Sequence, residues 1–129
     1  MKVQEKKIIS NPSDTVPEIR YFGRRTVEHF GLICLDGGHH IVGKTTLFKG
    51  GYSSTTVDVR VLLYYAIKHR ACAVIIWHNH PSGETSPSKL DIETTNKVKQ
   101  AFEICGMQLL DHIIIGRDDY FSFVEHNAI

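Results

Sequence analysis

The sequence predicts one α/β domain, α+β in its layering and built on a mixed sheet, and three observations lead to this expectation. The chain has 129 residues, the size of a single domain. Hydrophobic residues make up 42% and charged residues 22%, as in soluble globular proteins, which disfavours disorder and coiled coil. Segments of strand formers alternate with segments of helical periodicity. We expect one domain over residues 1–129, with residues 1–26 as its N-terminal extension.

The N-terminal segment predicts a short strand followed by a short helix. The strand is expected over residues 2–9. Asn11-Pro12-Ser13-Asp14 has the residue types of a turn or a helix start. We therefore expect the helix to follow this segment and to end at about Arg20.

A β-hairpin is predicted next. Residues 27–36 (VEHFGLICLD) are rich in strand formers, and residues 40–48 (HIVGKTTLF) can return beside them as the second strand. Between them, Asp36-Gly37-Gly38 is a turn signal, and Gly50-Gly51 ends the pattern.

A helix and a central strand are expected to follow the hairpin. Thr55 or Thr56 can cap a helix that runs from Val57 to about His69. Its apolar face is broad, which predicts a well-buried helix. That face consists of Val57, Val61, Leu62, Tyr64 and Tyr65. Residues 71–78 (ACAVIIWH) form a continuous apolar run, as expected for a buried strand in the middle of a sheet.

The last third of the chain predicts a long helix and two strands. The helix runs from about Ser88 to Cys105, and Gly106 fits its end. One side of this helix carries Leu90, Thr94, Val98, Ala101, Phe102 and Cys105. Strands are expected at about 108–116 and 120–125, with a turn at Arg117-Asp118-Asp119 between them.

Charge, hydropathy and cysteines narrow the classes of function. The formal net charge is +1, which does not indicate a dedicated nucleic-acid binder. No stretch approaches the ~20 apolar residues of a membrane span, and the N-terminus has no apolar run of signal-peptide length, so we expect a cytoplasmic protein without a membrane partner. Cys34, Cys72 and Cys105 each lie in an apolar segment, which predicts three buried, reduced thiols.

One group of residues indicates chemistry. His78 and His80 are two residues apart at the end of a predicted strand, so their side chains share a face. Ser88 and Asp91 are three apart at a predicted helix start and also share a face. The loop between the two pairs is short and contains proline and glycine, so it can fold the helix start over the strand end. We therefore expect two imidazoles and a carboxylate to meet around one point.

Two histidines and one carboxylate form the ligand set of a catalytic zinc site, whose bound water has a pKa of about 7. The same set also accepts iron and other divalent ions. Hydrolysis further needs a general base that is not bound to the metal. Glu28 is the leading candidate, because it opens a strand that could lie beside residues 71–78. The Ser88 hydroxyl could donate to the oxyanion of a tetrahedral intermediate.

Each of these residues also has a purely structural interpretation. Ser88-Lys89-Leu90-Asp91 matches a helix capping box. Glu28 alone would be a solvated strand residue, and Asp111-His112 would be a turn pair or a pair that supports the ligands. Capping does not explain two histidines separated by one residue at the end of a buried strand, so we favour the metal site.

With these residues in view, the sequence resembles the RadC family, a branch of the JAB/MPN (JAMM) metalloprotease superfamily. The superfamily pattern is a distal Glu, then His-x-His, seven residues, Ser, two residues and Asp. Here the pattern is met by Glu28, His78-Asn79-His80, Ser88 and Asp91. The RadC branch is further marked by HNHPSG and by LLDHIIIG, which spans residues 109–116 here.

The resemblance implies a JAB-type mixed and curved sheet flanked by helices, related to the cytidine deaminase fold. It implies zinc as the cofactor, with His78, His80 and Asp91 as its ligands. It further implies that Glu28 activates a water and that Ser88 assists in the transition state.

The chain also departs from the family in three places. Full-length RadC proteins carry an N-terminal helix-hairpin-helix region, for which we expect no room here, and this weighs against a DNA role carried over from the family name. Val59-Arg60-Val61 stands where the family favours Pro-Arg-Glu. Trp77 stands where the family favours a small residue, and we expect it to narrow the site or to shift specificity.

Three classes of function follow from these observations. The favoured one is a zinc metallopeptidase or isopeptidase that acts on a protein or peptide substrate, because the whole ligand set is present. The second is a DNA-repair or DNA-processing factor, for which the short basic groups at Lys6-Lys7, Arg24-Arg25 and Lys68-His69-Arg70 give weak support. The third is a non-catalytic metal-binding scaffold. Exposed strand edges are compatible with a dimer.

Overall fold

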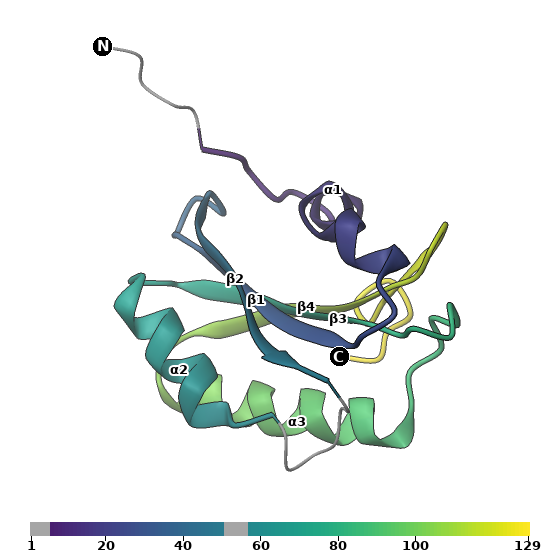
Figure 1. Cartoon of the computed structure of the whole chain (residues 1–129). Coiled ribbons are helices and arrows are strands. Elements are labelled where there is room, and N and C mark those ends of the chain that lie inside the picture. The colour runs from purple at the N-terminus through teal and green to yellow at the C-terminus, as the bar shows by residue number, and fades with distance from the viewer. Residues whose placement is uncertain (1–5, 51–56) are drawn as a thin grey trace.

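The computed structural model describes residues 6–50 and 57–129, and it has a five-stranded mixed sheet between two helical layers (Figure 1). The strands are β1 (His29–Leu35), β2 (Ile41–Lys49), β3 (Ala73–Asn79), β4 (Gln108–Ile115) and β5 (Tyr120–Ser122). Their order in the sheet is β2-β1-β3-β4-β5. Neighbouring strands are antiparallel except β3 and β4, which are parallel. The predicted α/β class and the hairpin are therefore confirmed.

Helices cover both faces of the sheet (Figure 1). One face carries α2 (Val59–Lys68) and α3 (Lys89–Ile104), and α3 makes the crossover between the parallel strands β3 and β4. The other face carries the short helical segments η1 (Pro12–Thr15), α1 (Val16–Ile19) and η2 (Arg20–Arg24). Within the described ranges, no helix is both long enough and apolar enough to span a membrane.

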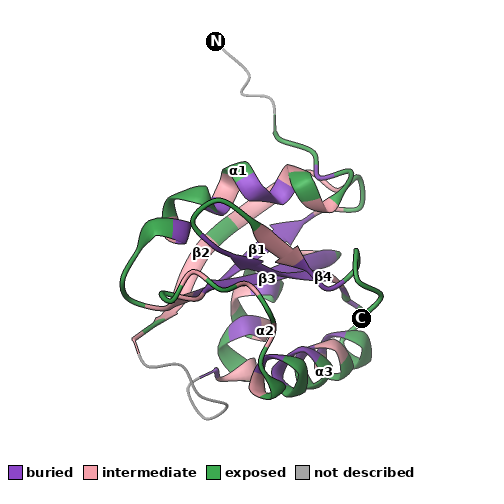
Figure 2. Cartoon of the chain, turned by 90° about the vertical axis from the view of Figure 1, so that its right-hand side faces the viewer, coloured by how far each residue is buried: buried purple, intermediate pink, exposed green. Residues whose placement is uncertain are grey.

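Strand β3 is the middle of the sheet and is buried along its whole length, as its apolar run predicts (Figure 2). Its side chains alternate between the two layers. Val74 and Ile76 belong to the core that also contains residues of α2 and α3. Ile75 and Trp77 belong to the core beneath α1, with Ile19. Each face of β3 therefore meets a different environment, and this alternation determines where the residues at its end lie.

Helix α2 differs from the prediction in its start and in its burial. It begins at Val59 rather than Val57, because the Asp58 side chain caps it by accepting a hydrogen bond from the Arg60 amide at 2.9 Å. The predicted capping residues, Thr55 and Thr56, lie outside the described residues.

The apolar face of α2 is narrower than expected. Leu62 and Ala66 are fully buried, whereas Val61 and Tyr64 are exposed, Tyr64 to 67%. The predicted broad burial is therefore wrong, because the helix packs on the sheet through one stripe and its outer side faces solvent.

Both ends of the domain also differ from the expected strands. Residues 2–5 of the predicted first strand lie outside the described residues, and Ile8 forms only an isolated bridge with His40. The last strand, β5, ends at Ser122 rather than at residue 125, and residues 123–127 form turns. The strand ends early because the Val124 amide donates to the Asp111 carboxylate at 3.0 Å instead of pairing with a neighbouring strand, and the chain turns there.

The cysteines fit the prediction in one case of three. Cys34 is buried in β1, and burial raises the pKa of its thiol to about 12. Cys72 and Cys105 are both exposed, which corrects the expectation of three buried thiols. Cys72 directly precedes β3 and Cys105 is the C-cap of α3, so both lie at element ends, where the apolar patterns no longer determine burial.

Candidate metal centre

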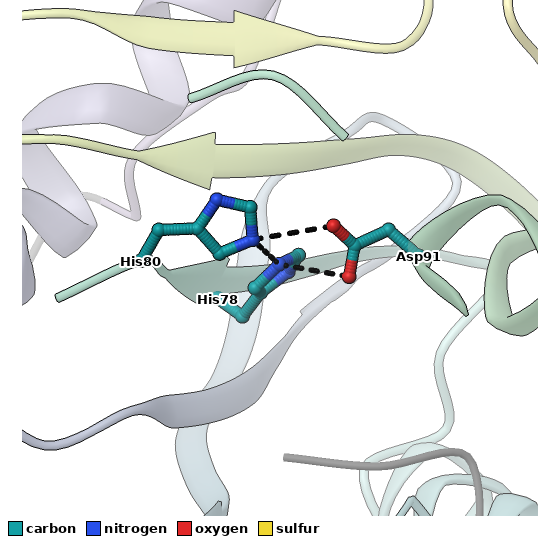
Figure 3. A group of neighbouring side chains, drawn as sticks. All are labelled: His78, His80 and Asp91. Carbon is teal, nitrogen blue, oxygen red and sulfur yellow. Dashed lines mark hydrogen bonds and ion pairs between the residues drawn. The ribbon is translucent and has the colours of Figure 1, made fainter. Parts of the chain in front are cut away.

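The three predicted ligand residues meet where the end of β3 faces the first turn of α3 (Figure 3). Nε2 of His78 and Nε2 of His80 lie 2.9 Å apart, and each lies 3.2 Å from a different carboxylate oxygen of Asp91. His78 and Asp91 are buried, and His80 is half-buried. The ligand atoms of the three residues all lie within 4.8 Å of one another. The expected convergence of two imidazoles and a carboxylate is therefore present in the structure.

Helix capping places the carboxylate at this point. Ser88 is the N-cap of α3, and its Oγ accepts a hydrogen bond from the Asp91 amide at 3.1 Å. In return, the Ser88 amide donates to Asp91 Oδ2 at 2.8 Å. The capping-box interpretation of this motif is thus correct. It is also compatible with a metal site, since it fixes Asp91 over the end of β3.

Hydrogen bonding to the loop after β3 determines which nitrogen of His80 faces the site. His80 Nδ1 lies 2.7 Å from the carbonyl oxygen of Glu84. A carbonyl can only accept, so Nδ1 must carry a proton. In the neutral imidazole, Nε2 therefore presents its lone pair toward Asp91.

A longer chain of hydrogen bonds determines which nitrogen of His78 faces the site. Thr95 Oγ1 donates to the backbone carbonyl of Asp91 at 2.8 Å, and so it accepts from His112 Nδ1 at 2.6 Å. With Nδ1 protonated, neutral His112 accepts at Nε2 from His78 Nδ1, which lies 2.8 Å away. His78 Nε2 is then left with its lone pair toward Asp91.

The charges follow from burial and from these contacts. Burial lowers the pKa of His78, and it lowers that of His112 well below its ordinary value, so both rings are neutral. For Asp91, burial favours the protonated form, but the close contacts with His78, His80 and the Ser88 amide prevail and hold its pKa below the usual range. The hydrogen bond to Asp91 raises the pKa of His80.

The donor set fits a metal ion. Two imidazole lone pairs and an ionised carboxylate converge, an arrangement that is repulsive unless a proton or a cation lies between them. Asp91 Oδ1 is buried and has no hydrogen-bond partner among the described residues, and its 3.2 Å contact with the unprotonated His78 Nε2 is an electrostatic one. Ligands of this kind hold zinc or iron in proteins.

Glu28 lies just before β1, which pairs with β3 as predicted, Phe30 being opposite His78. Its side chain is half-buried, and Oε2 is buried without a hydrogen-bond partner among the described residues. Burial raises the pKa of Glu28, with the charge of Asp91 raising it further and that of His80 lowering it. Glu28 is thus within electrostatic reach of the ligand set without being one of its members.

The remaining predicted residues fall on two sides of the sheet. His112 supports His78, whereas Asp111 contacts Ser122 on the opposite side, so the two residues are not a turn pair. Trp77 also faces away from the ligands and packs on Phe22, with ring centroids 4.5 Å apart. The expectation that Trp77 narrows the site is therefore wrong.

Thr95 is a supporting residue that the sequence reasoning missed. It lies four residues after Asp91 and therefore on the same helix face. A threonine at this spacing is the signal that could have found it. Its two hydrogen bonds connect the helix backbone with the histidine pair.

Comparison with known proteins shows which family the sequence matches. A family model described as "RadC-like JAB domain" matches residues 9–128. A UPF0758 protein of Streptococcus gordonii is 43% identical over 102 residues, which cover 79% of this chain and 45% of the relative. A UPF0758 protein of Staphylococcus haemolyticus is 42% identical over 123 residues, covering 94% and 54%. One of Flavobacterium johnsoniae is 38% identical over 120 residues, covering 93% and 52%.

The chain spans about half the length of these curated relatives. Their names state no activity, substrate or cofactor.

Proposed function

The chain belongs to the RadC-like JAB domain family, and from that premise we propose that it is a zinc-dependent hydrolase that cleaves peptide or isopeptide bonds. One observation carries the proposal: two imidazole lone pairs converge on a buried, ionised carboxylate at the end of a central strand. His78, His80 and Asp91 would hold the zinc and leave a fourth position for water.

When bound there, zinc supplies a Lewis acid and lowers the pKa of a water ligand to about 7. Glu28 would then act as the general base. Its Oε2 is buried and has no hydrogen-bond partner among the described residues, so it is available to take a proton. Because burial raises its pKa, the Glu28 carboxyl can both accept that proton and pass it to a leaving amine.

Ser88 would assist by donating a hydrogen bond. A lone pair of its Oγ accepts from the Asp91 amide, which leaves the hydroxyl proton for another acceptor. The residue is exposed, so a substrate can reach it. We propose that this proton is donated to the oxyanion that forms when the scissile carbonyl is attacked.

Nucleic-acid binding and a non-catalytic scaffold stay as alternatives. Two residues of the basic pairs have acidic partners: Lys7 lies 2.9 Å from Glu18 and Arg24 lies 3.5 Å from Asp118. Nothing among the described residues favours nucleic acid over a peptide. If nucleic acid binds, its affinity should fall steeply with salt.

Metal content tests the proposal first. Elemental analysis of the purified protein beside Asp91→Ala is expected to find about one zinc per chain, lost in the variant. The activity is then assayed with a fluorescence-quenched peptide library and a peptide that carries an ε-lysyl isopeptide bond. Glu28→Gln should keep zinc and lose hydrolysis. A native protein that takes up no zinc would contradict the enzyme and favour the scaffold.

A further inference from the structure

The side chain of Asn79 holds the backbone on both sides of Glu28. Asn79 stands between the two histidine ligands in sequence and is fully buried at the end of β3. Its Oδ1 accepts a hydrogen bond from the His29 amide at 2.6 Å. Its Nδ2 donates to the Val27 carbonyl at 3.1 Å. The one amide group therefore contacts the residue before and the residue after the proposed base.

The contacts of the Asn79 side chain continue the β1–β3 pairing by one position beyond the last backbone pair. The β1–β3 ladder ends with Phe30 opposite His78, so His29 and Asn79 stand at the next position. A side-chain amide offers a carbonyl and an N–H as a peptide group does, and here it takes the place of a backbone pair. On the side of β2, the Gly50 amide donates to the Glu28 carbonyl at 2.9 Å. Glu28 is thus held from both neighbouring strands.

We propose that Asn79 is a positioning residue for Glu28 that sets the place of the Glu28 carboxylate relative to the metal ligands. The inference rests on the proposed function, because the carboxylate has a chemical task only if the site hydrolyses a substrate. Asn79 acts through the backbone, since its two hydrogen bonds go to the peptide groups of Val27 and His29. Its neighbours in sequence are the proposed metal ligands His78 and His80, so one short segment would fix both the ligands and the base.

The amide is the group that this task requires. Aspartate in this place would keep an acceptor for the His29 amide, but it would lose the donor to the Val27 carbonyl and set an anionic oxygen against it. Alanine would remove both contacts. Misplacement of a catalytic group by about 1 Å can lower the rate by about 100-fold. Because alanine removes both contacts and aspartate only one, turnover should fall more in Asn79→Ala than in Asn79→Asp.

Hydrogen exchange tests the clamp without any substrate. In Asn79→Ala the His29 amide loses its acceptor, and its exchange should become about tenfold faster or more. In Asn79→Asp it should stay close to wild type. The Ile33 amide, in the same strand, is the internal reference and should not change. Asn96→Asp, an exposed substitution on α3, is the matched control. Unchanged exchange at His29 in Asn79→Ala would overturn the clamp.

Metal affinity and turnover then test whether Asn79 acts through Glu28. In Asn79→Ala, the dissociation constant for zinc and the KM should be unchanged, whereas kcat should fall by about 100-fold. Asn79→Asp should show a smaller loss. The double variant with Glu28→Gln should be no slower than Glu28→Gln alone, because Asn79 acts through Glu28.

Three results would contradict the inference. Loss of zinc in Asn79→Ala would mean that Asn79 supports the ligands instead. A further loss of turnover in the double variant would mean that it acts independently of Glu28. A wild-type protein that binds zinc and cleaves no peptide of the library would overturn the proposed function, a failure that the exchange measurement distinguishes from failure of the clamp itself.

Discussion

Two buried aspartates on opposite faces of the sheet differ in what surrounds them. Asp111 accepts hydrogen bonds from three fixed donors. These donors are Ser122 Oγ at 2.6 Å, the His112 amide at 2.7 Å and the Val124 amide at 3.0 Å. Among the described residues, Asp91 has one such donor to its carboxylate, the Ser88 amide, and otherwise faces imidazole nitrogens. The carboxylate of Asp111 faces fixed hydrogen-bond donors, whereas that of Asp91 faces two imidazole nitrogens that can share a cation with it.

The pKa values of the two carboxyls move in opposite directions. Burial raises the pKa of Asp111, and its hydrogen bonds from Ser122 and the two amides only partly oppose this. At Asp91 the contacts with the two histidines overcome burial, and the pKa falls. Burial alone therefore does not identify a site. A buried carboxylate that faces lone pairs is a candidate for a ligand, and one that faces fixed donors is part of the fold.

Replacing each carboxyl by an amide should give the largest difference. Asp91→Asn is expected to lower zinc affinity by more than about 100-fold, since loss of a ligand should exceed the loss of a supporting group. Asp111→Asn should keep zinc and lower the free energy of unfolding by about 1–3 kcal/mol. Competition with a chelating dye measures the first effect and urea unfolding the second. Equal loss of zinc in both variants would refute the distinction.

Removing the hydroxyl that contacts His112 or the one that contacts Asp111 should give the next largest difference in zinc affinity between the two faces of the sheet. Thr95→Val removes the acceptor for His112 Nδ1 and should weaken zinc binding by about 10–100-fold, while Thr95→Ser should restore it. Ser122→Ala, the matched change on the opposite face, should leave zinc binding intact and cost about 1 kcal/mol of stability. If Thr95→Val binds zinc as tightly as the wild type, the chain of hydrogen bonds does not orient His78.

The pH dependence of unfolding should separate the two carboxyls in the metal-free protein. The pKa of Asp111 is raised in the folded state, so its contribution is full below the unfolded value of about 3.9 and is lost as pH rises through the folded value. The pKa of Asp91 is lowered, so its contribution is present above about 3.9 and is lost as pH falls.

Unfolding in EDTA between about pH 3 and pH 6 measures these signs. Relative to wild type, Asp111→Asn should gain stability as pH rises, and Asp91→Asn should gain as pH falls. Parallel curves for the two variants would show that the carboxyls have the same environment.

Local patterns in the sequence were enough to predict that His78, His80 and Asp91 converge, as they do in the structure. The run at 71–78 predicts a central strand, and the spacings His78-x-His80 and Ser88-x-x-Asp91 each put a pair on one face, so the site needs only a short loop to form. The hairpin likewise follows from a turn between two strand-forming segments.

The supporting residues could not be predicted in this way, because they depend on tertiary register. The β3–β4 pairing has an irregularity that leaves Leu110 without a partner in the register. Leu109 therefore packs beside α3, whereas Asp111 lies on the opposite side, although simple alternation would put both on one face. The contact between Asn79 and His29 joins residues 50 positions apart, which no local pattern contains.

Trp77 gives the smallest expected effect on the site and the sharpest test of the separation between the faces. Its indole lies so close to Gly31 that a β-carbon there would overlap it, and its Nε1 is buried without a hydrogen-bond partner among the described residues. Trp77→Phe loses apolar volume but also removes an unpaired N–H, so the change in stability should stay within about 2 kcal/mol. Zinc affinity and the cleavage profile of the peptide library should not change. A shifted profile would mean that Trp77 reaches the substrate, as its place in the sequence suggested, and the two faces of β3 would then not be independent.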